Sequence, residues 1–71
     1  MKFGLIERTG SIRGGYEYKL IINGGKVRVY PSLTAAMEYA HLRRCSEVEL
    51  ISSAGFTLGR WDLRNTYGNP Y

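Results

Sequence analysis

The sequence has few of the residues from which disulfides, metal centres and nucleophilic sites are built. Its 71 residues include one cysteine and one histidine, so no internal disulfide can form and a zinc site would need scattered carboxylates as its other ligands. No run approaches 18 apolar residues, which excludes a membrane-spanning helix. The first residues lead into Glu7 and Arg8 without an apolar stretch, so we expect no secretory signal. These absences indicate a protein of the reducing cytoplasm that makes no contact with a membrane.

Phosphate-binding and catalytic motifs are also missing. Gly25 and Lys26 are followed by Val27, where a P-loop has Ser or Thr. His41 and Cys45 lie four residues apart, and we interpret them as a packing pair at a helix end rather than as a metal or nucleophile pair. The sequence therefore predicts no catalytic residue, no metal site, no cofactor and no enzymatic activity.

Acidic residues are scarce relative to basic ones. Ten Lys and Arg against six Asp and Glu give a net charge of +4, and residues 1–31 alone carry a net +4. Seven of the ten basic residues are Arg, which favours bidentate contacts to phosphate or carboxylate. This distribution predicts a basic surface, which by its charge alone suits nucleic acid, an acidic protein face or membrane headgroups. A net charge of this size is also what keeps an ordinary small domain in solution.

The apolar pattern predicts one helix among short strands. Ser32 is the expected helix N-cap, and Leu33, Ala36, Met37 and Ala40 form the apolar stripe of the helix that follows. The remaining segments read as a strand over residues 2–8, a loop over 9–15, a hairpin of 16–22 and 26–30, a strand over 47–52, a strand over 56–63 and an irregular tail over 64–71.

These elements predict a single α+β domain over residues 1–71. The order is β-β-β-α-β-β, with an antiparallel sheet of four to five strands packed on one helix. The helix covers one face of this sheet and leaves the other face open.

The hairpin around Asn23-Gly24-Gly25 decides which side chains reach the open face. A two-residue turn at either dipeptide puts Tyr16, Tyr18, Leu20, Ile22, Val27 and Val29 on the helix side, and Glu17, Lys19, Ile21, Lys26, Arg28 and Tyr30 on the open side. A three-residue turn would instead put Lys26 and Arg28 on the Leu20 side. The clean separation into an apolar and a basic face favours the two-residue turn.

Binding residues are expected on this open face. Basic side chains beside an aromatic ring are suited to phosphate contacts and to stacking on a base or sugar. Arg13, in the glycine-rich loop, is expected to act as a mobile helper, while Trp61 fits either an interface or the end of the core. The predicted binding residues are Lys19, Lys26, Arg28, Tyr30 and Arg13.

A strand, a Ser-Leu-x-x-Ala-x-x-x-Ala helix and a second strand follow one another between residues 27 and 51. The residues are Val27-Arg28-Val29-Tyr30-Pro31, then Ser32-Leu33 with Ala36 and Ala40, then Val48-Glu49-Leu50-Ile51. This arrangement resembles small phage-encoded inhibitor proteins of the type that block host RNA polymerase or CRISPR effectors. The first hairpin is also similar to the three-stranded arm-binding domain of phage integrases, whose strands enter a DNA groove.

The resemblance implies a phage-type binding protein in a bacterial host. We therefore expect it to inhibit a nucleic-acid-handling host protein, a polymerase or a CRISPR effector, by occluding its surface. Two alternatives are direct binding of DNA or RNA through the basic hairpin face, and self-association through the open face. The protein is expected to be a monomer or a homodimer.

Overall fold

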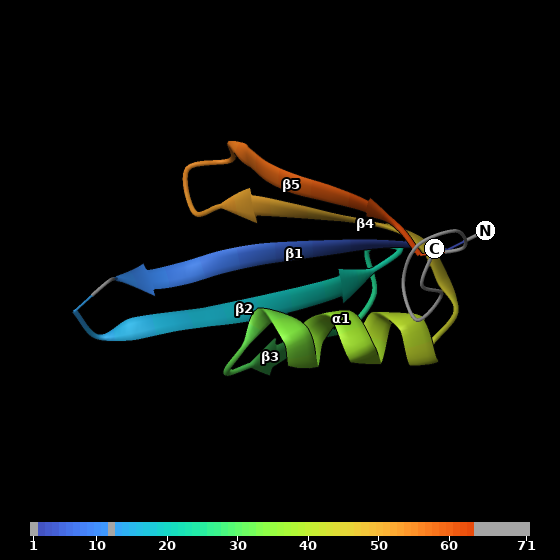
Figure 1. The fold of residues 1–71 in the computed structure, drawn as a ribbon, viewed down its shortest axis with the longest axis horizontal. Helices are drawn as coiled ribbons and strands as arrows, with labels where there is room; N and C mark the ends of the chain where they lie inside the picture. The colour runs from blue at the N-terminus through green and yellow to red at the C-terminus, as the bar shows by residue number, and fades with distance from the viewer. Residues whose placement is uncertain (1, 12, 64–71) are drawn as a thin grey trace, which may run out of the picture.

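The computed structural model describes residues 2–11 and 13–63, and the tail expected over residues 64–71 lies outside the described residues. The described chain is a single α+β domain in which five strands form one sheet, with the order β3-β2-β1-β4-β5. One helix packs across part of this sheet (Figure 1). The elements are β1 (Lys2–Ser11), β2 (Gly15–Ile22), β3 (Val27–Tyr30), α1 (Leu33–Leu42), β4 (Cys45–Ser52) and β5 (Thr57–Asp62).

The predicted order of elements is confirmed, but the sheet is mixed rather than antiparallel. Strand β1 runs parallel to β4, with Leu5 opposite Glu49 and Ile6 opposite Leu50, whereas the other three pairs of strands are antiparallel. The reason is the direction of α1, which runs back along the sheet after β3 (Figure 1). The chain therefore enters β4 in the same direction as β3 and β1, and a crossover through a helix is the connection that parallel strands require.

Helix α1 begins as its sequence predicts. The Ser32 hydroxyl accepts a hydrogen bond from the backbone N–H of Ala35 at 3.2 Å, which satisfies one of the free N–H groups of the first turn. Ala36, Met37 and Ala40 are buried and Leu33 is half-buried, so the predicted apolar stripe faces the sheet. Their contacts in the sheet centre on three side chains that are fully buried: Ile6, Leu20 and Val48.

The β2–β3 hairpin has a different register from the one predicted. Asn23 and Gly24 have positive φ angles of 51° and 71°, and the N–H of Gly25 donates to the carbonyl of Ile22 at 2.8 Å. This is the expected tight turn. However, Ile21 pairs with Val27, whereas a two-residue turn at Asn23-Gly24 would pair it with Lys26. The connection therefore contains one residue more than a two-residue turn, on the side of β3. The extra residue turns every side chain of β3 to the opposite face of the sheet.

The prediction that Lys19 and Arg28 share a face is therefore wrong. Arg28 pairs with Leu20 and lies on the helix side, whereas Val29 pairs with Lys19 on the open side. Val27 and Val29, expected beneath the helix, are 53% and 52% exposed. The physical reason lies in the helix: the ring of Tyr39 lies over this part of the sheet and packs against the side chains of Arg28 and Tyr30.

Trp61 in β5 belongs with the core. It is half-buried and packs against the buried cluster. Its indole ring lies directly over Gly59, where an added Cβ would stand 2.6 Å from Trp61 Cη2. The ladder between β4 and β5 is irregular just before Gly59, since Leu50 pairs with Gly59 and Ile51 pairs with Thr57. The sequence had left open whether Trp61 forms an interface or caps the core, and the structure shows the second.

Candidate anion-binding cleft

A basic cleft lies between the C-terminal end of α1 and the β2–β3 turn. Its volume is about 290 Å³. Four cationic side chains line it, and they come from four separate segments: β1, the turn, β3 and the residue that caps the helix. These are Lys2, Lys26, Arg28 and Arg43. The other described residues that line it are Leu20, Ile22, Gly25 and Tyr39, so none of the carboxylates that the structure describes faces the cleft.

The ring of Tyr39 holds the two guanidinium groups in place. The Arg28 Cζ atom lies 5.0 Å from the centroid of the Tyr39 ring, and the Arg43 Cζ atom lies 5.8 Å from it. Both distances are within the range of a cation–π contact. Tyr39 and Arg43 are four residues apart in the helical stretch, a spacing that brings side chains together on one face. A guanidinium ordered in this way loses less conformational freedom when it binds an anion.

Tyr30 supports the arrangement from β3. The centroids of the Tyr30 and Tyr39 rings are 5.7 Å apart and the rings are inclined by 36°. Burial raises the pKa of the Tyr30 phenol above its ordinary value of 10.0, although the charge of Arg28 acts in the opposite direction. The phenol therefore keeps its proton at neutral pH and adds no negative charge beside the arginines.

Among the described residues, no ion pair joins a cation of the cleft to a carboxylate. Within residues 2–11 and 13–63, the ion pair in the structure joins Arg60 to Glu47 at 3.1 Å, on the open face of the sheet. The Lys2 Nζ donates a hydrogen bond to the carbonyl oxygen of Arg43 at 3.1 Å, which also satisfies the end of the helix. Within the described part of the chain, no carboxylate therefore competes with an external anion for the positive charge of this cleft.

The structure brings together two of the five predicted binding residues. Lys26 and Arg28 line the cleft, and the ring of Tyr30 packs against the ring of Tyr39, which also lines it. Lys19 lies on the opposite face of the sheet. Arg13 belongs to the β1–β2 connection, at the far end of the sheet from the β2–β3 turn (Figure 1).

Sequence reasoning missed three residues of the cleft, which are Lys2, Tyr39 and Arg43. One signal for two of them was present in the sequence. Tyr39 and Arg43 have the four-residue spacing of a helical aromatic–cation pair, and the cation stands at the helix end where it also complements the backbone dipole. Nothing in the sequence marked Lys2, because its place in the cleft depends on the position of β1 in the sheet.

A second, more apolar groove adjoins the cleft along the outer side of α1. It has a volume of about 490 Å³ and shares Tyr39 with the cleft. Leu42 is 74% exposed at its edge. The lining residues are Tyr30, Ala35, Glu38, Tyr39, His41 and Leu42.

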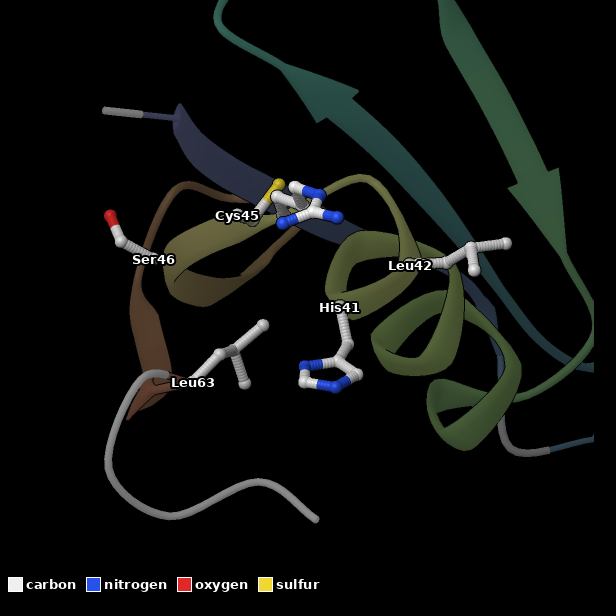
Figure 2. A pocket seen from close by; sticks show the side chains of 6 residues that line it. His41, Leu42, Cys45, Ser46 and Leu63 are labelled. Atoms are coloured by element: carbon white, nitrogen blue, oxygen red, sulfur yellow. The ribbon is translucent and has the colours of Figure 1, made fainter. Parts of the chain in front are cut away.

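A third pocket, of about 520 Å³, holds the histidine and the cysteine of the described chain (Figure 2). Cys45 is buried as the first residue of β4, and His41 is exposed near the end of α1, with its ring directed toward Leu63. Burial raises the pKa of the Cys45 thiol, against the effect of the nearby Lys2 and Arg43 charges. A raised pKa disfavours the thiolate that a nucleophile or a metal ligand requires. Among the described residues no three His, Cys, Asp or Glu side chains are grouped as metal ligands.

Comparison with protein-family models, curated proteins and solved structures finds no match to this chain. The resemblance to phage inhibitors therefore remains a prediction. No helix in the described part of the chain is long and apolar enough to cross a membrane.

Proposed function

We propose that this protein is a small non-enzymatic binding module whose basic cleft holds the phosphate backbone of a nucleic acid. The observation that carries the proposal is the convergence of Lys2, Lys26, Arg28 and Arg43 on one cleft, with no carboxylate among the described residues that line it. Arginine forks and lysine ammonium groups are the usual protein partners of backbone phosphates. Because such contacts fix position without reading bases, the proposal implies binding with little sequence preference.

The number of cations sets the expected salt dependence. If each of the four neutralises one phosphate, the logarithm of the affinity for a single strand falls with a slope of roughly −2.8 against the logarithm of the salt concentration. Between about 50 and 200 mM salt the affinity then falls roughly 50-fold. The removal of one cation reduces the slope to about −2.1 and the loss to roughly 20-fold.

Fluorescence anisotropy with a labelled oligonucleotide of mixed sequence tests this. The informative variants are Arg28→Gln and Lys26→Gln, each of which removes one charge from the cleft. The matched controls are Arg13→Gln at the distant β1–β2 connection and Lys19→Gln on the opposite face. We expect the cleft variants to weaken binding and flatten the salt slope, with both controls close to the original protein. Equal losses in all four variants would show that net charge, and not the cleft, binds the nucleic acid.

A protein target is the second candidate, in which the module inhibits a nucleic-acid-handling host protein by surface occlusion. The observation that favours it is the groove in which exposed Leu42 stands beside Tyr30 and Tyr39, with Arg28 next to them. Tyr and Arg around an apolar centre are the composition of binding hot spots. Capture from bacterial lysate at about 0.3 M salt, with and without nuclease, separates the candidates, since such salt screens exposed phosphate contacts strongly. One stoichiometric protein that survives nuclease supports inhibition, and loss of every partner after nuclease supports nucleic acid.

Self-association is a third outcome that the open face of the sheet allows. Val27 and Val29 are exposed there. Sedimentation equilibrium of the original protein and of Val29→Lys decides it. A dimer that the substitution dissociates supports the self-associating module, and a monomer at all concentrations excludes it.

A further inference from the structure

We infer that the nucleic acid held by the cleft is single-stranded, with one base seated in the aromatic groove beside it. The inference rests on the proposed function and specifies its ligand. The cleft and the groove meet at Tyr39, which lines both. A strand that passes from one to the other therefore meets cations first, and then the apolar surface of Tyr30 and Leu42.

This order of surfaces, first cationic and then apolar, matches the alternation of phosphate and base in a nucleotide chain. Each nucleotide joins one anionic phosphate to one flat, largely apolar base, and proteins bind single strands by combining a positive groove with aromatic side chains. In a duplex the bases are paired and stacked inside, so their faces cannot enter a groove on a protein surface unless a base is extruded, which costs unstacking energy. A cleft for phosphate that continues into an aromatic groove thus favours the strand whose bases are already unpaired.

The carboxylate of Glu38 favours a base over an acidic peptide as the occupant of the groove. The groove is lined by this exposed carboxylate together with Tyr30, Tyr39 and Leu42. A carboxylate repels acidic side chains at short range, so it opposes a peptide rich in Asp and Glu. It accepts hydrogen bonds from the exocyclic amines of bases, as Asp and Glu do with cytosine. The cations lie in the cleft and the carboxylate in the groove, which suits phosphate in the first and base in the second.

Two exposed apolar residues provide a matched pair of variants. Leu42 is 74% exposed at the groove, and Phe56 is 71% exposed in the β4–β5 connection, at the other end of the sheet (Figure 1). Neither is part of the buried core, so both Leu42→Ala and Phe56→Ala should fold. We expect Leu42→Ala to weaken binding of a 12-nucleotide strand about 3- to 10-fold while its salt slope stays unchanged, because no charge is lost. Phe56→Ala should bind as the original protein does.

The ligand is varied in parallel. The probes are the 12-nucleotide strand, the duplex of the same sequence, the same strand with abasic sites in place of its central bases, and a poly-glutamate peptide of equal charge. We expect the strand to bind at least about 10-fold more tightly than either the duplex or the abasic strand.

The outcomes separate the inference from the proposed function. If the duplex binds as tightly as the strand, or if abasic sites and Leu42→Ala have no effect while Arg28→Gln still weakens binding, the inference is overturned and the phosphate-binding function stands. If no nucleic acid binds in a salt-dependent manner, the proposed function fails and the inference fails with it. Tighter binding of poly-glutamate than of the strand would overturn both in favour of an acidic protein partner.

Discussion

Asn23 in the β2–β3 turn is the position at which single substitutions test the turn and its link to β1. Its φ angle of 51° lies in the left-handed region, which Asn tolerates better than other residues with a Cβ. Its side-chain Oδ1 accepts a hydrogen bond from the backbone N–H of Phe3 at 2.8 Å. Its own N–H donates to the carbonyl of Phe3 at 2.9 Å. The residue therefore extends the pairing of β1 and β2 beyond the last ladder pair, Gly4 with Ile22.

The expected loss of stability follows from these two features. In Asn23→Ala the left-handed conformation costs about 1 kcal/mol, and the lost hydrogen bond costs about 1 kcal/mol more. The sum of about 2 kcal/mol corresponds to a fall in Tm of roughly 10 °C for a domain of this size. In Asn23→Gly only the hydrogen bond is lost, so the fall should be about half as large. Asn23→Asp keeps both features and should remain within about 0.5 kcal/mol.

Thermal and urea unfolding followed by far-UV circular dichroism measure the series. We expect Asn23→Asp to be as stable as the original protein, Asn23→Gly to be less stable, and Asn23→Ala to be the least stable. If Asn23→Gly were as unstable as Asn23→Ala, the positive φ would contribute nothing. If Asn23→Asp lost about 2 kcal/mol, the bond to Phe3 would not be the source of the stability, and the turn described here would be wrong.

Three further predictions concern the helix cap, β5 and the buried thiol. Ser32→Ala removes the acceptor for the Ala35 N–H and should destabilise the domain by about 1 kcal/mol in urea unfolding, whereas Ser32→Asp should not. Gly59→Ala forces a Cβ against the Trp61 ring and should cost about 1–3 kcal/mol, with a change in tryptophan fluorescence as the ring is displaced. Burial raises the pKa of Cys45 above its ordinary value of 9.0, so the unfolded chain releases this proton at a lower pH than the folded one. Stability against urea should therefore be independent of this group below about pH 9 and fall as the pH rises above it, and a Cys45→Ala variant should show a shallower fall.

Much of the fold could be predicted because local signals specified it. The Ser32 cap and the stripe of Ala36, Met37 and Ala40 define α1, and the alternation of Val48 and Leu50 with polar residues defines β4. The direction of β4 relative to β1 could not be predicted, because it depends on the path of the whole chain through α1. An antiparallel meander and a helical crossover fit the same strand pattern.

The candidate site was harder to predict because it depends on one residue of register. Apolar and basic side chains alternate cleanly along the hairpin, and the rule that apolar side chains face the core selected a two-residue turn. That rule ignored Tyr39, which supplies an aromatic surface for Arg28 and Tyr30 on the helix side. An arginine stem and a tyrosine ring can both cover apolar surface while their polar ends reach water, so they are as acceptable beneath the edge of a helix as valine. The alternation of apolar and polar residues in the sequence carries no information on such contacts.

The parallel pairing of β1 with β4 also has a consequence for how the chain folds. Strand β1 is synthesised first and lies in the middle of the sheet, so one of its edges pairs early with β2 and the other waits for β4. In that late pair Lys2 lies opposite Cys45, across most of the chain, and closing so long a loop is slow compared with forming a hairpin. Until it closes, the backbone N–H and C=O groups along one edge of β1 are unpaired and can recruit a strand of another molecule. The nascent chain is therefore most vulnerable to aggregation between the completion of the first hairpin and the arrival of β4.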